Sequence, residues 1–256
     1  MVAVAVVSAQ PVSLEAFWTD ETQASLPVLQ NKLENLVAKV NRTSGSNEIG
    51  RLRNLVDLTH RKMLRSYSTY PTLKEIAAGK YDCLTATVFF SAVLEASGFR
   101  FSIIETNYHI FLMVHTTQGD VLLETTDRYR GVETDALQIE KRIGSYRHLL
   151  TASTAPSQEV YQYTFDLYRQ VHPAQLKGLL IFNEAVRAYN ERNVALCGEK
   201  LLEASRIYHT PRIPELAAIV LQTLPFSKEM KDTDKDQLRT ALMPLAGQAV
   251  LPIASR

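Results

Sequence analysis

The chain has 256 residues, of which 46% are hydrophobic and 21% are charged, and this composition is ordinary for a globular protein. A formal net charge of +1 argues against a basic nucleic-acid-binding protein, and two cysteines, Cys83 and Cys197, are too few for a disulfide framework or a clustered zinc site. Apart from the N-terminus, no stretch is apolar for long enough to suggest a membrane span.

The first nine residues form an apolar run that ends in Val7-Ser8-Ala9 and is followed by Gln10-Pro11. Small residues at this spacing are typical of a signal-peptidase site, although no Lys or Arg precedes the run. We therefore interpret residues 1–9 as the remainder of a secretory signal, which predicts a periplasmic or extracellular protein. The alternative is a cytoplasmic protein with a mobile or strand-like N-terminus.

Three helices are predicted before residue 80. Leucines at helical spacing predict an amphipathic helix over residues 26–40 that ends at a polar loop, 43–46. A second apolar pattern extends from residue 49 to residue 64 and predicts a helix that ends before Tyr70-Pro71, because the residue before a proline avoids the helical region. A short helix over residues 72–78 then ends at Gly79, which can adopt the C-cap conformation.

The helix predicted over residues 83–96 differs from the first three. Apolar side chains cover most of its circumference, and a helix of this kind is buried inside a domain. It begins at Cys83, Asp82 can cap it, and Gly98 ends it. The sequence therefore places a thiol at the start of a buried helix.

Three strands are predicted next, over residues 99–105, 108–116 and 120–126, because these segments are rich in β-branched and aromatic residues. Gln118-Gly119 marks a hairpin turn between the last two. Apolar residues fill both faces of the middle segment, so we expect a central strand with a helix on at least one side. Residues 131–150 are predicted to mix strand, loop and short helix.

The composition changes at residues 151–156, a predicted linker, and the region 157–256 is predicted to be all helical. Residues 174–190 and 194–208 form a predicted helix pair with the spacing of one tetratricopeptide repeat, and a plain helical hairpin packed on the first domain is the alternative. Small residues, Cys197 among them, stand where the two helices would touch. Further helices are expected around 213–224 and 234–245, and a protein partner could bind this region.

Cys83, His109 and Glu124 follow one another in the order of one kind of thiol active site. A thiol needs a base to become a good nucleophile, and the base needs a group that fixes its orientation. A helix N-terminus and an imidazolium both favour the thiolate. In this hypothesis Cys83 attacks an amide or ester carbon, His109 transfers the proton, and the backbone N–H of Cys83 stabilises the oxyanion.

The third position is open between Glu124 and Asp127, and the hairpin register separates them. If residues 116–119 form a four-residue loop with Gly119 in a left-handed conformation, His115 pairs with Asp120 and His109 shares a face with Glu124. If the loop comprises residues 117–119 alone, His109 faces Asp127.

Several short segments resemble the core of the transglutaminase-like superfamily, a branch of the papain-fold thiol enzymes. They are Gly79-Lys-Tyr-Asp-Cys83, Ser97-Gly98-Phe99, Asn107-Tyr-His109-Ile-Phe111 and Leu122-Leu-Glu124-Thr-Thr126. The similarity covers about residues 72–131, with Glu124 where the family usually has aspartate and Phe111 where tryptophan is common. The resemblance favours Glu124 as the third member of the triad.

The resemblance also implies an α+β core over residues 10–150, in which the Cys-bearing helix packs on a small antiparallel sheet. Some relatives carry tetratricopeptide-like helices after this core, and some are non-catalytic.

Two functional hypotheses follow. The first is a thiol-dependent amide hydrolase or acyl transferase that acts on a peptide, a protein or another amide through a thioester, with Cys83, His109 and Glu124 as its triad. Hydrolysis and transfer both remain open, and no metal or organic cofactor is implied. The second is a catalytically degenerate transglutaminase-like protein that serves as a protein- or peptide-binding module.

Overall fold

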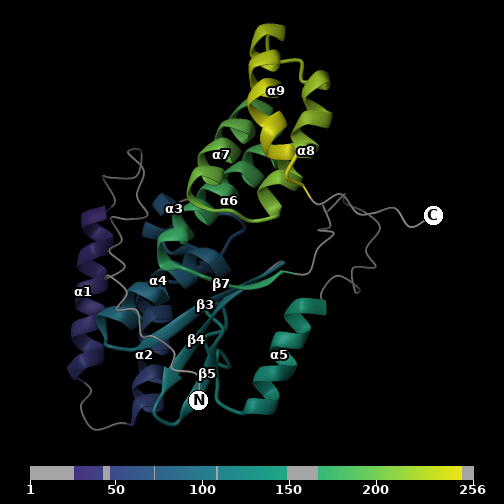
Figure 1. The fold of residues 1–256 in the computed structure, drawn as a ribbon. Helices are drawn as coiled ribbons and strands as arrows, with labels where there is room; N and C mark the ends of the chain where they lie inside the picture. Colours follow the sequence, from purple (N-terminus) through teal and green to yellow (C-terminus); the bar gives the residue numbers. More distant parts are fainter. Residues whose placement is uncertain (1–25, 43–46, 72, 108, 149–166, 250–256) are drawn as a thin grey trace.

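A computed structural model of the chain describes residues 26–42, 47–71, 73–107, 109–148 and 167–249. The expected signal segment 1–9, the polar loop 43–46 and the expected linker 151–156 lie outside the described residues. Within the described part, helices, a central sheet and a further group of helices follow one another along the chain (Figure 1). The structure is therefore α+β, as the sequence predicts.

An antiparallel sheet forms the central layer, and its strand order in the described chain is β6-β5-β4-β3-β7. The strands are β3 (Arg100–Thr106), β4 (Ile110–Thr116), β5 (Gly119–Leu123), β6 (Val132–Glu133) and β7 (Tyr168–Val171). The central position of β4 agrees with its two apolar faces. Strand β5 is shorter than expected, because the chain leaves the ladder after Leu123 and forms a loop.

Helices cover both faces of the sheet (Figure 1). On one side, α4 (Cys83–Ala96) packs with Phe89 and Phe90 in the same apolar core as Leu112 and Val114 of β4. The helices α1 (Leu26–Arg42) and α2 (Glu48–Lys62) pack against α4. On the other side, α5 (Ala136–His148) covers Phe111 and Leu122. Helix α4 is thus covered by the sheet on one side and by helices on the other, which explains why it is apolar nearly all round.

The second helix ends earlier than expected. Helix α2 ends at Lys62, and Met63 and Leu64 are buried beyond its end. The N–H groups of Arg65 and Ser66 then bond to the carbonyl of Gly79, which starts a short parallel pair of β1 (Ser66–Tyr67) and β2 (Lys80–Tyr81). In the chain, helix α3 (Leu73–Ala77) connects these two strands, and Gly79, which has a φ of +91°, follows its end. This small pair leads the chain directly into Cys83.

The C-terminal region is not wholly helical, which corrects the expectation for residues 157–256. Strand β7 first joins the edge of the sheet beside β3 and satisfies a backbone edge that would otherwise be open. After the short η4 (Pro173–Gln175) come α6 (Leu176–Asn190), α7 (Val194–Ile207), α8 (Arg212–Thr223), η5 (Leu224–Phe226) and α9 (Asp232–Ala246). The helices agree with the apolar spacing.

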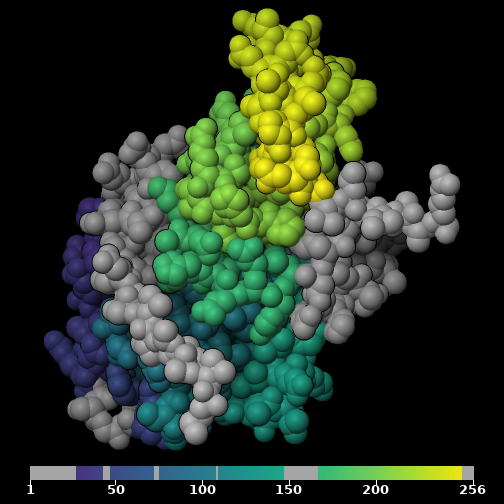
Figure 2. All heavy atoms as spheres, in the orientation of Figure 1, coloured from purple at the N-terminus to yellow at the C-terminus, as the bar shows by residue number. Residues whose placement is uncertain are grey.

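These C-terminal helices stand above the sheet layer in the orientation of Figures 1 and 2. They enclose a second core in which Ala185, Cys197 and Ala204 are fully buried, as their small size predicts. Helix α6 also joins the first core through Leu176, Leu179 and Leu180, so the two cores meet along α6. In the part of the chain that the structure describes, no helix is both long and apolar enough to cross a membrane.

Candidate active site

Cys83 is the first residue of α4, and a reciprocal cap fixes the start of that helix. The carboxylate of Asp82 accepts a hydrogen bond from the N–H of Thr85 at 2.8 Å, and the Asp82 N–H donates to the Thr85 hydroxyl at 2.8 Å. The Cys83 side chain is partly exposed, whereas residues 84–94 behind it are buried. The carbonyl of Cys83 accepts a hydrogen bond from Thr125 Oγ1 at 3.3 Å, which joins the helix start to the loop after β5.

His109 directly precedes β4, and the hairpin register decides which acid it meets. His115 pairs with Asp120, and Gly119 has a positive φ of +116°. This is the first of the two registers considered from the sequence. It brings His109 Nε2 to 2.5 Å from Glu124 Oε2. His115 itself lies near the turn and bonds to Asp120 and Ser102 at a partly exposed position.

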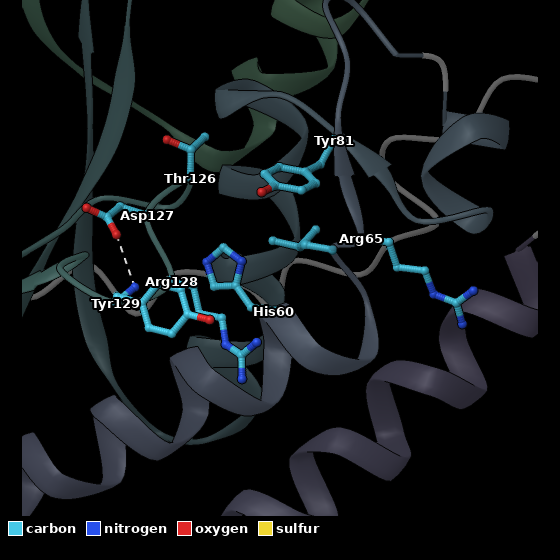
Figure 3. A pocket seen from close by; sticks show the side chains of 8 residues that line it. His60, Arg65, Tyr81, Thr126, Asp127, Arg128 and Tyr129 are labelled. Atoms are coloured by element: carbon cyan, nitrogen blue, oxygen red, sulfur yellow. Dashed lines mark hydrogen bonds between the residues drawn. The ribbon is translucent and has the colours of Figure 1, made fainter.

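Asp127, the rival for the third position, has another role. Its carboxylate accepts hydrogen bonds from the N–H groups of Tyr129 at 3.0 Å and Arg130 at 2.9 Å, and it closes a turn there (Figure 3). The loop is also closed by the Glu124 N–H, which donates to the Gly131 carbonyl at 2.8 Å. A Cβ on Gly131 would clash with the carbonyl oxygens of Glu124 and Asp127. Glycine is therefore needed at this point to hold Glu124 in place.

The Glu124 carboxylate is nearly buried, with a side chain that is 8% exposed, and several donors surround it. Besides His109, it accepts hydrogen bonds from the Thr126 N–H at 3.1 Å, the Thr126 hydroxyl at 2.7 Å and the Tyr146 hydroxyl at 2.7 Å. Burial raises the pKa of Glu124, but the hydrogen bond and charge of His109 and these other donors lower it to about 2. Glu124 is thus a fixed carboxylate at neutral pH.

The His109 imidazole is 15% exposed and interacts with both the Glu124 carboxylate and the Cys83 side chain. Burial by itself lowers the pKa of His109, but a hydrogen bond to the Cys83 side chain, together with the hydrogen bond and charge of Glu124, raises it to about 10. Because Nε2 is bonded to Glu124, Nδ1 is the ring nitrogen that remains for the sulfur. The ring is therefore an imidazolium at neutral pH, a state that stabilises a neighbouring thiolate.

Tyr146 is a member of this cluster that the sequence did not reveal. It comes from α5, and its ring lies 4.6 Å from the His109 ring between centroids, so it holds both the imidazole and the carboxylate. The pKa of the Tyr146 hydroxyl is raised by burial and by the adjacent Glu124 charge, which keeps it a hydrogen-bond donor. A tyrosine on a helix predicted only as mixed structure gave no signal of this role.

A pocket of about 400 Å³ lies near Glu124, although Cys83, His109 and Glu124 are not among the residues that line it. It is lined by Tyr81, two residues before Cys83, and by Thr126, whose hydroxyl bonds to Glu124. His60 of α2 and Asp127 line it as well, whereas the guanidinium of Arg65 points away from it (Figure 3). Thr126 therefore connects the wall of the pocket to the Glu124 carboxylate.

The sequence pattern gave no indication of His60, since it lacks the combination of a cysteine and an acid that accompanies His109. It is 4% exposed, and burial and the charge of Arg128 lower its pKa to about 4, so its ring is neutral. Among the described residues, no group is hydrogen-bonded to His60 Nε2. A neutral, buried imidazole thus forms part of the wall of the pocket.

Tyr67 and Tyr70 lie within electrostatic range of Cys83. Burial raises the pKa of both hydroxyls, and the charges of Cys83 and Asp82 raise them further. Tyr70 has a φ of +50°, an unusual conformation for a residue with a side chain. Among the residues that flank the site in the sequence, Asn107 has a structural role, because its side-chain Oδ1 accepts a hydrogen bond from the N–H of Leu167. Tyr108 lies outside the described residues.

In the described ranges, no three His, Cys, Asp or Glu side chains are grouped as a metal site. Comparison of the chain with protein-family models, with curated proteins and with solved structures found no match in any of the three. The geometry of Cys83, His109 and Glu124 therefore carries the argument about function.

Proposed function

We propose that the chain is a thiol-dependent amide hydrolase or acyl transferase of transglutaminase-like type that works through a thioester on Cys83. One observation carries this proposal. His109 is hydrogen-bonded at 2.5 Å to the buried Glu124, and the Cys83 side chain at the start of α4 lies near enough to the same imidazole to help raise its pKa. A nucleophile, a base and a group that orients the base are thus joined in one series, which is the arrangement that covalent thiol catalysis requires.

In the first step the Cys83 thiolate attacks the carbonyl carbon of an amide, and the carbonyl oxygen takes the negative charge. The Asp82 carboxylate is occupied by the Thr85 N–H, so we assign the Cys83 N–H at the helix start as a donor to this oxyanion. The bond from carbon to nitrogen then breaks. The His109 imidazolium gives its Nδ1 proton to the departing amine, and a thioester remains on the sulfur.

In the second step the neutral His109 accepts a proton from the incoming nucleophile as that nucleophile attacks the thioester carbon. The bond from carbon to sulfur breaks, and the thiolate and the imidazolium are restored. Water as the nucleophile gives hydrolysis, and a primary amine gives acyl transfer. The same three residues serve both outcomes.

Glu124 keeps the imidazole in one orientation and stabilises its charged form. The hydrogen bonds from Thr126 and Tyr146 hold both carboxylate oxygens, so Glu124 can orient His109 although it is longer than the aspartate usual in the resembling family. The pocket beside Thr126 and Tyr81 offers space for a part of the substrate. Its walls include the neutral His60 and the Tyr81 hydroxyl, so we expect a polar substrate group there.

The test is the alkylation of the folded protein by iodoacetamide between about pH 5.5 and pH 9, with peptide mass spectrometry to separate Cys83 from Cys197. We expect Cys83 to react well below pH 8 and much faster than Cys197, and we expect His109→Ala to slow it. Incubation with an activated ester such as p-nitrophenyl acetate should leave an acetyl group on Cys83 that hydroxylamine removes, as a thioester requires. Adding a primary amine then separates transfer from hydrolysis by the products formed.

Equal and slow labelling of both cysteines, unchanged in His109→Ala, would contradict the proposal. That result would favour the second hypothesis, a degenerate core that acts as a protein- or peptide-binding module. Circular dichroism of each variant serves as the control for folding.

A further inference from the structure

Two helices of the C-terminal region send polar side chains to points next to the proposed triad. Asn183 of α6 donates a hydrogen bond from Nδ2 to Asp82 Oδ2 at 3.3 Å. Arg212, the first residue of α8, donates a hydrogen bond to the carbonyl of Thr106. Asp82 directly precedes Cys83, and Thr106 stands three residues before His109. Contacts from one region thus reach both the nucleophile and its base.

The contact at Thr106 continues directly to His109. The Thr106 N–H donates to the His109 carbonyl at 2.8 Å, and the Thr106 hydroxyl donates to the same carbonyl at 3.1 Å. Thr106 is fully buried at the end of β3. One residue therefore separates the Arg212 guanidinium from the backbone that carries the imidazole.

A buried charged cluster fixes Arg212 in this position. Glu105 is 1% exposed, and its Oε1 lies 3.4 Å from Arg212 Nη1. The Tyr208 hydroxyl donates to Glu105, and Arg169 lies 4.0 Å from Glu105 Oε2 with its guanidinium 4.7 Å from the centre of the Tyr208 ring. A buried carboxylate needs these partners in one geometry, because loss of any of them leaves a charge without compensation.

Tyr70 gives a separate indication that Arg212 lies close to the nucleophile. Burial raises the pKa of the Tyr70 hydroxyl, the charges of Asp82 and Cys83 raise it further, and the charge of Arg212 lowers it. One hydroxyl is thus within electrostatic range of Arg212, Asp82 and Cys83 together.

We propose that Asn183 and Arg212 are positioning residues of the triad, so that the C-terminal helices form part of the active site. This inference rests on the proposed function. Asn183 holds the cap on which Cys83 begins, and Arg212 holds the turn that presents His109. Neither side chain contacts the reacting atoms. They act by keeping the sulfur and the imidazole at a fixed separation, and a misplacement of about 1 Å can lower a rate roughly 100-fold.

The experiment compares iodoacetamide labelling of Cys83 across pH in the wild type, Arg212→Gln, Arg212→Lys and Asn183→Ala. We expect labelling near neutral pH to fall roughly 10- to 100-fold in Arg212→Gln, and its pH profile to move toward that of an ordinary thiol. Arg212→Lys keeps a donor for the Thr106 carbonyl and should restore part of the rate. Asn183→Ala should show a smaller change in the same direction.

Arg187→Gln is the matched control. Arg187 also connects α6 to the core, since it lies 3.2 Å from Glu75 of α3, but neither of these residues contacts the triad. We expect it to lower the melting temperature while the pH profile of Cys83 stays unchanged. If Arg212→Gln does not fold, Glu105→Gln/Arg212→Gln removes both charges of the pair, and Asn183→Ala tests the other contact independently.

The outcomes separate this inference from the proposed function. Wild-type labelling profiles in folded Arg212 and Asn183 variants would overturn the inference, while fast, His109-dependent labelling of the wild type would still support the thiol enzyme. Slow labelling in the wild type, unchanged by His109→Ala, would contradict the proposed function itself.

Discussion

The two cysteines both lie near the start of a helix, but their surroundings in the fold differ. Cys83 begins α4 at a partly exposed position and meets an imidazole. Cys197 lies inside α7 with no exposed surface, and burial raises its pKa to about 12. Each thiol lies in the first two turns of a helix, yet among the described residues only Cys83 has a base beside it. The reactivity of a thiol therefore depends more on the groups around its sulfur than on its position along a helix.

The largest expected effect comes from removing the charge of Glu124. In Glu124→Gln the imidazole loses the partner that keeps it charged, so we expect labelling of Cys83 near pH 6 to fall roughly 10- to 100-fold, toward the slow rate of Cys197. The matched comparison is Asp127→Asn, in which an amide oxygen can still accept the N–H groups of Tyr129 and Arg130 and keep the turn, and it should lower the rate much less than Glu124→Gln does. A larger loss in the Asp127 variant would reverse the assignment of the third residue.

The next effect is on stability as a function of pH. The pKa of His109 is raised from 6.5 to about 10, so its contribution to folding is complete below pH 6.5 and disappears as the pH rises through 10. The pKa of Glu124 is lowered from 4.5 to about 2, so its contribution is complete above pH 4.5 and disappears as the pH falls through 2.

We therefore expect the difference in unfolding free energy between the wild type and His109→Gln to be on the order of 2 kcal/mol and to be largest between pH 4.5 and pH 6.5. Urea unfolding at several pH values measures it. His115→Gln is the control, because His115 lies at the exposed hairpin end. A difference that does not change with pH would show that the pair is not ionised in the folded state.

A smaller effect is expected from Tyr146→Phe, which removes one donor from Glu124 and keeps the ring against His109. Loss of a hydrogen bond to a charged group should cost about 1.5 to 3 kcal/mol of unfolding free energy, and labelling of Cys83 should slow by less than about tenfold. Tyr129→Phe is the control, since that side chain is 86% exposed. Equal behaviour of the two variants would mean that Tyr146 does not support the carboxylate.

The smallest effect on the chemistry is expected at the other thiol. Cys197→Ser places a hydroxyl in the second core and should lower the unfolding free energy by about 1 to 3 kcal/mol, as thermal unfolding would show. Labelling of Cys83 should not change, because Cys197 packs with apolar side chains that do not reach the triad. A marked loss of Cys83 reactivity would show that packing in the second core, and not only Asn183 and Arg212, positions the site.

Much of the fold was predictable because its elements are local. The spacing of apolar residues located α1, α4 and α6 to α9, and the two apolar faces of β4 placed it at the centre of the sheet. Strand β7 was missed, because four residues with an exposed face carry little pattern and become a strand only against the free edge of β3. The early end of α2 was missed for a similar reason, since it depends on hydrogen bonds to Gly79.

The candidate site was predictable only in part. Chain order suggested Cys83, His109 and an acid, but two hairpin registers kept Glu124 and Asp127 open until the pairing of His115 with Asp120 was known. The supporting residues gave no signal. Tyr146 is 22 residues from Glu124, Asn183 is 101 residues from Asp82, and Arg212 is 106 residues from Thr106.

The sequence by itself determined where the thiol stands, because a capping aspartate and a long apolar run define the start of a buried helix through local interactions. Only the tertiary structure decided which acid meets His109 and which distant side chains contact Asp82 and Thr106. Those choices depend on strand register and on the packing of α6 and α8 against the core. Both are set by contacts between residues far apart in the chain, which a local pattern does not encode.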